Sequence, residues 1–238
     1  MAFINAQKSR CLVGSLGLSG FAKSFGFNAD VDMIDVTVIA NTAKAFIVGQ
    51  DTSTFSAELV LDTDTTAGGL HAVLTAWKSA AATPITYAPS GLTALSEAFL
   101  IGALETSFTP SAAVGGAVMA SISAQTDGQS DAGFVIEDAT AITITGNGTA
   151  RDLTAQSTTG AVAHLHVSAF SGLTNDIVTI EDSADGSAGW ATIGTFATVT
   201  GLTSQRLAIA GTVKRYVRVV DTATGTGSTT RAVSFARR

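Results

Sequence analysis

The sequence predicts a mainly β protein with one helix, in which a first domain over residues 1–142 is followed by a small all-β sandwich over residues 143–238. Most apolar segments are short, alternate with polar residues and end at Gly, Asn or Asp, which is typical of strands. One segment has helical spacing instead. Residues 1–145 carry 5 basic and 13 acidic groups, whereas the remainder carries 8 and 6. Such a shift in charge favours two domains.

The composition argues against several classes of protein. Charged residues make up 13% of the chain, against about a quarter in soluble domains. A surface of Thr, Ser, Gly and Ala does not suit tight non-specific binding of nucleic acid, which needs clustered Lys and Arg. No apolar run approaches the ~20 residues of a membrane span, and Cys11, the single cysteine, cannot form an intrachain disulfide. We expect a soluble protein made inside the cell, without a leader peptide.

The first half predicts strands. In residues 54–61, Phe55, Ala57 and Leu59 fall on one face while Ser56 and Glu58 fall on the other, which is the period of a half-buried strand. Segments of this kind are bounded by turn-forming residues. The predicted strands are residues 25–29, 35–40, 45–48, 54–61, 85–87, 97–108 and 117–124.

A single amphipathic helix is predicted over residues 67–81. Thr65 or Thr66 can cap its start, because a hydroxyl oxygen accepts a free backbone N–H there. Pro84 follows its end. The apolar stripe has the spacing i, i+3, i+4 and i+7 and consists of Leu70, Val73, Leu74 and Trp77.

The second half contains no segment with helical spacing, and Gly, Asn, Asp and Ser turns separate its strands as in a small sandwich. Leu165 and Val167 alternate with His164 and His166, which predicts one solvated and one buried face. Its predicted strands are residues 141–145, 163–169, 176–181, 190–200, 205–210, 212–220 and 231–235.

Histidine offers the first candidate chemistry. His164 and His166 are two residues apart, so in a strand they point the same way and could share a metal ion. No third ligand follows from the sequence, and the exposed face of an edge strand accounts for both residues. His71 flanks the helical stripe and is not favoured as a catalytic base.

Three further motifs have simpler explanations than a binding site. The acidic segment 181–186 could hold calcium, but it lacks the spacing of a calcium loop and reads as a hairpin turn. The glycine-rich segment 14–20 lacks the features of a phosphate loop and predicts a flexible N-terminal arm. The basic residues of 214–218 form a solvated face or pair with a neighbouring subunit. We therefore expect no enzyme activity, no cofactor and no resident metal.

Several stretches nevertheless resemble a known family. In the first half these are residues 25–32, 36–38, 41–49 and 54–59, followed by the helix. This pattern resembles the major tail tube proteins of long-tailed, siphovirus-type bacteriophages. The second half resembles the C-terminal domain of actinophage-type major tail proteins, in residues 146–149, 160–167, 182–187, 211–218 and 235–238.

The resemblance implies a structural virion protein of the viral tail, made in the host cytoplasm. Its copies would form hexameric rings stacked into a tube, which contains the tape-measure protein and later conducts DNA into the host. Strands of each copy would join into an inner β-barrel, so that neighbours satisfy the open strand edges. Residues 1–142 would then be the tail-tube domain, and the second domain a sandwich on the outer surface.

The resemblance also suggests two groups of functional residues. Acidic side chains on the lumen wall would repel phosphate and let a duplex slide; the candidates are Asp30, Asp32, Asp35 and Glu58. The loop 39–46 is the candidate for contact between stacked rings, through Asn41, Thr42, Lys44 and Phe46. A carbohydrate-binding adhesin and a capsid decoration protein would share the Thr/Ser-rich strands, so both stay open as alternatives.

Overall fold

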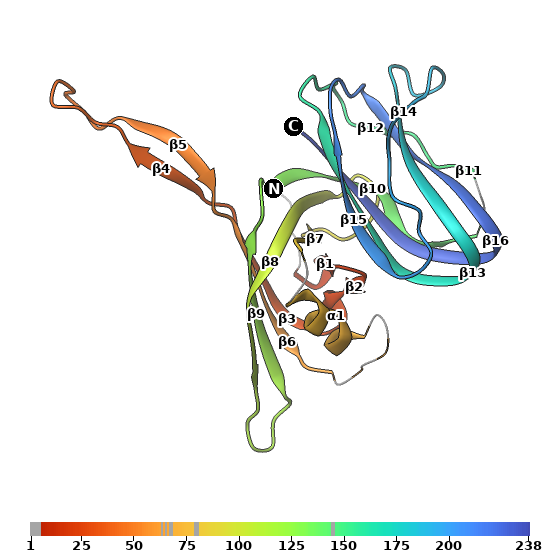
Figure 1. Cartoon of the computed structure of the whole chain (residues 1–238), viewed down its shortest axis with the longest axis horizontal. Helices are drawn as coiled ribbons and strands as arrows, with labels where there is room; N and C mark the ends of the chain where they lie inside the picture. Colours follow the sequence, from red (N-terminus) through yellow and green to blue (C-terminus); the bar gives the residue numbers. More distant parts are fainter. Residues whose placement is uncertain (1–5, 63, 65, 67–68, 79–80, 144–145) are drawn as a thin grey trace.

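The computed structural model describes residues 6–62, 64, 66, 69–78, 81–143 and 146–238. As predicted, this part of the chain is mainly β with one α-helix (Figure 1). Fourteen strands are joined by hydrogen bonding into one sheet system, and β4 and β5 form a separate ribbon. The first-half elements are β1 (Arg10–Val13), β2 (Leu16–Gly17), β3 (Ala22–Asn28), β4 (Val31–Asp35), β5 (Phe46–Asp51), β6 (Thr54–Val60), α1 (Leu70–Trp77), β7 (Thr83–Ala88), β8 (Glu97–Ser111) and β9 (Met119–Thr126).

The first half is built on the antiparallel sheet β3–β6–β9–β8. The predicted alternation in β6 is confirmed, because Phe55, Ala57 and Leu59 are buried while the residues between them are exposed. Helix α1 packs on the buried face of this sheet through the predicted stripe, and the Trp77 indole N–H donates to the Ala103 carbonyl at 3.1 Å.

Three first-half predictions need correction. Helix α1 begins after Gly69, which caps it without a side-chain hydrogen bond, so Thr66 is not the cap; Thr65 and part of the predicted helix ends lie outside the described residues. The segment 14–20 is not a flexible arm, because β2 and a 3-10 turn fold it into the core, where Leu18 is fully buried. Strand β4 ends at Asp35, whereas the sequence predicts a strand that begins there.

The second-half elements are β10 (Asp131–Ile142), β11 (Gly146–Asn147), β12 (Arg151–Asp152), β13 (Ala161–Ser183), β14 (Ala191–Thr195), β15 (Thr203–Ile209) and β16 (Tyr216–Arg237). Strands β13 and β16 pair with each other over most of their length and curve around one apolar core. The sequence predicts two short strands in place of each. β-Bulges near Gly172 and Gly225, both at positive φ, bend the pair without ending it.

The two halves share a sheet and a small core. Strand β10 pairs with β8 on one side and with β16 on the other. Ala88 and Leu100 of the first half pack with Val162 and Ala236 of the second. Strand β10 ends at Ile142, but its first residues belong to the shared sheet, so the domain boundary at 142/143 stays a prediction.

An ionic cluster lies inside the second half. The Arg231 side chain is fully buried and donates to three carboxylates. The distances are 2.7 Å from Nε to Glu137 and 2.6 Å from Nη1 to Asp176, and Nη2 donates to Asp221. The stability of the fold depends on every member of such a cluster, because a buried charge without its counter-charge is strongly unfavourable.

Asp221 makes this cluster sensitive to pH. Burial raises the pKa of its carboxyl to about 6, although Arg231 favours the charged form. The folded chain therefore keeps a proton on Asp221 that the unfolded chain loses near pH 4. As the pH rises from about 4 to about 6, we expect the free energy of unfolding to fall by at most about 3 kcal/mol. Asp221→Asn should flatten this part of the profile in chemical denaturation at each pH. The exposed-site control Glu97→Gln should keep the wild-type slope, and superimposable profiles for wild type and Asp221→Asn would contradict the assignment.

Candidate functional site

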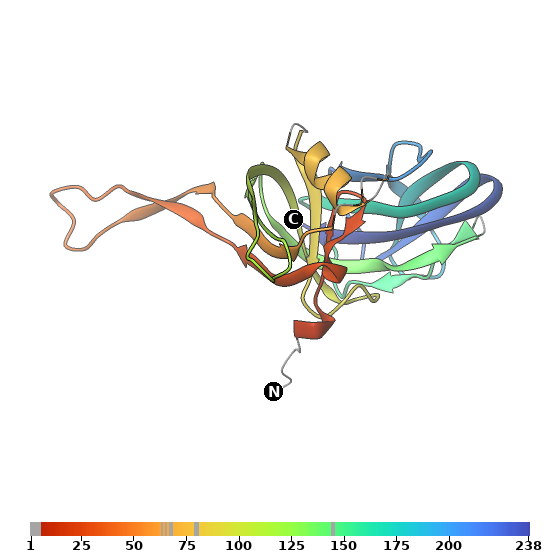
Figure 2. The ribbon, with the colours of Figure 1, turned by 90° about the horizontal axis from the view of Figure 1, so that it is seen from below.

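The ribbon of β4 and β5, called here the arm (residues 30–51), is highly exposed and projects away from both halves (Figures 1 and 2). A two-stranded ribbon is marginally stable by itself. Large exposed apolar patches mark interaction surfaces. The arm carries Val31, Met33, Ile34, Val36, Val38, Ile39, Phe46, Ile47 and Val48, each at least 40% exposed.

The predicted stacking residues lie on this arm. Asn41, Thr42 and Lys44 are exposed in the loop that joins β4 to β5, and Phe46 is 47% exposed at the start of β5. The sequence predicts the loop but not the apolar surface beside it, because alternating apolar residues in a strand ordinarily indicate a buried face. Their role in stacking stays a prediction.

The root of the arm is held by Asp51. Its carboxylate accepts hydrogen bonds from the Ser53 N–H (2.9 Å) and hydroxyl (2.5 Å) and from the Ser130 N–H and hydroxyl (both 2.8 Å). Burial raises the pKa of Asp51, but these bonds outweigh it and lower the pKa to about 2. The Thr52 N–H also donates to the Asp30 carbonyl at 2.8 Å. These bonds fix the direction in which the arm leaves the sheet.

The β3–β6–β9–β8 sheet has a polar outer face, opposite α1. This face points away from the second half (Figures 1 and 2). Most of its side chains are small hydroxyls. Its two central rows, read from β3 to β8, are Ser24–Glu58–Ser121–Thr109 and Gly26–Ser56–Ser123–Ser107, all exposed.

Both borders of this sheet are open within the described part of the chain. Strand β3 pairs only with β6, and residues 105–111 of β8 pair only with β9. Pro110 lies on the β8 border, where a residue without an N–H is tolerated. Glu105 begins this border, and its Oε2 atom is buried without a hydrogen-bond partner. The sheet is therefore incomplete on two sides in a single copy.

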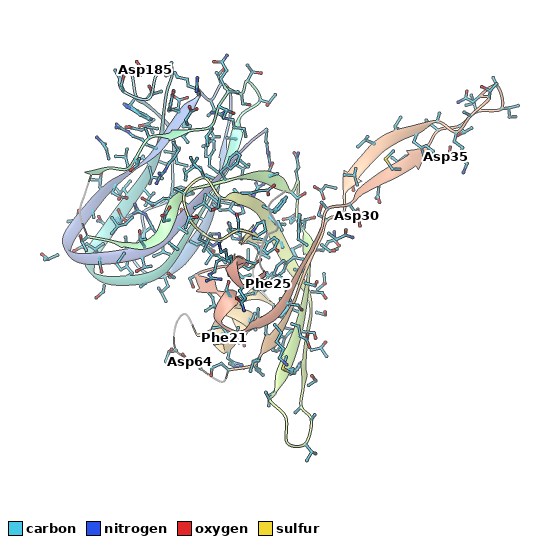
Figure 3. The ribbon with its side chains drawn as sticks, turned by 180° about the vertical axis from the view of Figure 1, so that it is seen from behind. Phe21, Phe25, Asp30, Asp35, Asp64 and Asp185 are labelled. Atoms are coloured by element: carbon cyan, nitrogen blue, oxygen red, sulfur yellow. The ribbon has the colours of Figure 1, made fainter. Side chains whose placement is uncertain are left out.

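The four candidate lumen residues do not form one group. Asp30 lies at the root of the arm and Asp35 farther along it (Figure 3). Asp32 lies in β4 of the arm and Glu58 on the polar face, and all four side chains are exposed. Hydrogen bonds from the Thr37 side chain and N–H lower the pKa of Asp35. Sequence proximity suggests one surface, but the arm carries three of the four residues away from the sheet. Their lumen role stays a prediction.

The prediction that His164 and His166 lie on the exposed face of an edge strand is wrong. His164 and His166 are 0% and 2% exposed, because β13 lies between β15 and β16 and the first half covers its second face. The His166 Nδ1–H donates to the Gly14 carbonyl (2.7 Å), and Nε2 accepts from the Thr86 hydroxyl (2.8 Å). Burial lowers the pKa of both residues, that of His166 to about 4. They hold the two halves together in the uncharged form.

The acidic segment 181–186 ends strand β13 and begins the hairpin turn to β14, and the sequence favours a turn here. The Asp185 carboxylate accepts the N–H groups of Ser187 and Ala188, and Gly186 has φ +75° (Figure 3). In the described residues no group of three or more His, Cys, Asp or Glu side chains is placed to hold a metal ion. His71 is exposed on α1.

The basic segment 214–218 forms ion pairs within the chain, with the Lys214 and Arg215 side chains still partly exposed, so it is a solvated face in part and finds its acidic partners without a neighbouring subunit. Its three ion pairs are Lys214–Asp182 at 3.2 Å, Arg215–Asp152 at 2.6 Å and Arg218–Glu181 at 2.6 Å. No helix in the described part of the chain is long and apolar enough to cross a membrane.

No protein-family model and no curated protein matches the sequence. Among solved structures, the chain is similar to a tail chain of an empty gene transfer agent particle refined with C6 symmetry, at 10% identity and a TM-score of 0.38 over 46% of this chain and 80% of that one. A chain from the virion of the native gene transfer agent is 12% identical, with a TM-score of 0.41 over 53% of this chain and 95% of that one. The SPP1 Dit protein is described as a hub of the adsorption apparatus in phages that infect Gram-positive bacteria. It is 11% identical, with a TM-score of 0.40 over 97% of this chain and 99% of that one. At these values the similarity is weak, so function is inferred below from this chain's own surfaces.

Proposed function

We propose that this chain is a structural protein of a phage virion tail, whose copies join edge to edge into rings that stack into a tube. The observation that carries the proposal is the open border on each side of the β3–β6–β9–β8 sheet. An exposed strand edge is a template for pairing, and neighbours of the same sequence can complete it.

The strand directions fit such a ring. Each neighbouring pair in the sheet is antiparallel, so β3 and β8 at its two borders run in opposite directions. When rotation about a ring axis brings β8 of one copy against β3 of the next, the new pair is antiparallel as well. A sheet can therefore continue around the ring without a break, and six copies is the number that the sequence resemblance implies.

The polar face then lines the lumen. Its hydroxyl groups give a duplex no basic cluster to bind, and Glu58 repels phosphate. The second half lies on the other side of the sheet (Figures 1 and 2). In the proposed ring this side is the outer one. A conduit for DNA delivery needs no catalytic group, no cofactor and no specific base contact; its partners are further copies of the chain, the tape-measure protein and other tail proteins.

Negative-stain electron microscopy of the concentrated full-length chain tests this function. We expect rings, and rods built from stacked rings. A monodisperse monomer at every concentration would overturn the proposal, and glycan binding by that monomer would favour an adhesin.

A further inference from the structure

The two layers of the second half are joined near their bend by the buried ionic cluster. Strands β13 and β16 bend together and contribute residues to both layers (Figure 1). Arg231 lies in the same layer as Glu137 of β10, because β10 pairs with residues 229–235 of β16. Asp176 and Asp221 lie on the other side of the bulges, in the second layer. The guanidinium therefore connects the layers.

This cluster contains an unsatisfied acceptor. Asp176 is 1% exposed, and its Oδ1 atom is buried without a hydrogen-bond partner, although its Oδ2 atom accepts from Arg231 Nη1 at 2.6 Å. A buried carboxylate oxygen without a donor is unfavourable. Three carboxylates also share one guanidinium, so ionisation of all three would leave two negative charges uncompensated in the interior.

Asp221 can supply the missing donor. Val178 of β13 pairs with Asp221, and Asp176 pairs with Ala223, so the two aspartates are diagonal neighbours on the same buried face. Burial raises the pKa of the Asp221 carboxyl to about 6, so the group carries a proton below this pH. A protonated carboxyl has an O–H group that donates a hydrogen bond.

Charged groups face Asp221 from three strands: Arg231 from β16 itself, Glu137 from β10 and Asp176 from β13. Strand β11, which also pairs with Asp221, is Gly146–Asn147 and brings no charge. Arg231 and Glu137 are joined by two hydrogen bonds, which leaves Asp176 as the acceptor for the Asp221 proton. Further charges of β10 and β12 line a pocket beside Glu137 and belong to Asp138 and Arg151.

We propose that Asp176 and Asp221 share one proton, and that this proton is a latch that keeps the two layers of the second half together at the bend. The Asp221 O–H donates to Asp176 Oδ1, which satisfies the free acceptor and removes one negative charge. Loss of the proton leaves two carboxylates side by side in the interior, and separation of the layers at the bend hydrates them. The bend is therefore closed at acidic pH and loosens as the pH rises through about 6.

Hydrogen exchange followed by mass spectrometry tests the latch in the full-length chain. After correction for the intrinsic effect of pH, the amides of residues 173–178 and 219–225 should exchange faster at about pH 8 than at about pH 5. The expected factor is at most about a hundredfold, because the pKa of Asp221 lies about two units above its ordinary value. Asp221→Asn should abolish the difference, since an Asn amide donates to Asp176 at either pH.

The exposed-site control Glu97→Gln should keep the wild-type difference. Equal corrected exchange of these amides at the two pH values in the wild type would overturn the latch.

Asp176→Asn separates a shared proton from one that Asp221 holds alone. Infrared spectroscopy detects the C=O band of a protonated carboxyl, and in the wild type a band of this kind should disappear as the pH rises through about 6. Because Asp176→Asn removes the neighbouring charge, the midpoint of that band should fall by about one pH unit, a tenfold change in proton affinity. An unchanged midpoint would overturn the sharing, and a wild-type spectrum without the titrating band would overturn the whole inference.

Discussion

A chain with lysine at both Ser24 and Thr109 is expected to fold as the wild type does and to lose ring formation. The two residues lie in one row on the outer face of β3 and β8, the strands that border the open sheet. If that row continues into the next copy, the two lysines lie opposite each other at each seam, which is the border where β8 of one copy pairs with β3 of the next. Like charges across a strand pair cost up to about 1 kcal/mol, which is about fivefold in an association constant. The penalty recurs at every seam of the ring, and analytical ultracentrifugation measures it.

Two matched variants make this result specific. Ser56→Lys with Ser121→Lys puts the same two charges in the interior of the same face and should leave assembly close to that of the wild type. Ser24→Lys with Thr109→Glu sets opposite charges across the seam and should restore rings. Equal assembly by the Lys/Lys and Lys/Glu chains would show that these two edges do not meet.

Replacing Arg231 by methionine is expected to lower the free energy of unfolding by about 3–5 kcal/mol. The change leaves the carboxylates of Glu137, Asp176 and Asp221 near one another without the guanidinium that they share. Chemical denaturation at neutral pH measures the loss. Arg215→Met removes an ion pair at the surface and should change stability little. Equal stability of the two variants would contradict a structural role for the buried cluster.

Local patterns in the sequence predict much of the first half. Periodicity in a sequence indicates an element with one buried face. Strand β6 is such an element, and so is helix α1, whose buried stripe consists of Leu70, Val73, Leu74 and Trp77. The same reasoning misplaces His164, because β13 is covered on both faces at that point and a polar residue in alternation no longer marks solvent.

Long-range features are harder to predict from the sequence. Strands β13 and β16 continue through bulges at Gly172 and Gly225, which are read as turns when the partner strand is unknown. The arm is predicted as strands and a loop, but its projection depends on the bonds of Asp51 to Ser130, a residue 79 positions away. The open borders of the sheet follow from pairing and have no signature in any single segment.

The most direct measurement is the structure of the assembled protein by cryo-electron microscopy, at a resolution that shows strand pairing between copies. The account predicts backbone hydrogen bonds between β3 of one copy and residues 105–111 of β8 in the next, in antiparallel order, with Glu58 facing the lumen. Copies that contact one another only through their arms or their second halves, with β3 and β8 unpaired at both sheet borders, would contradict it.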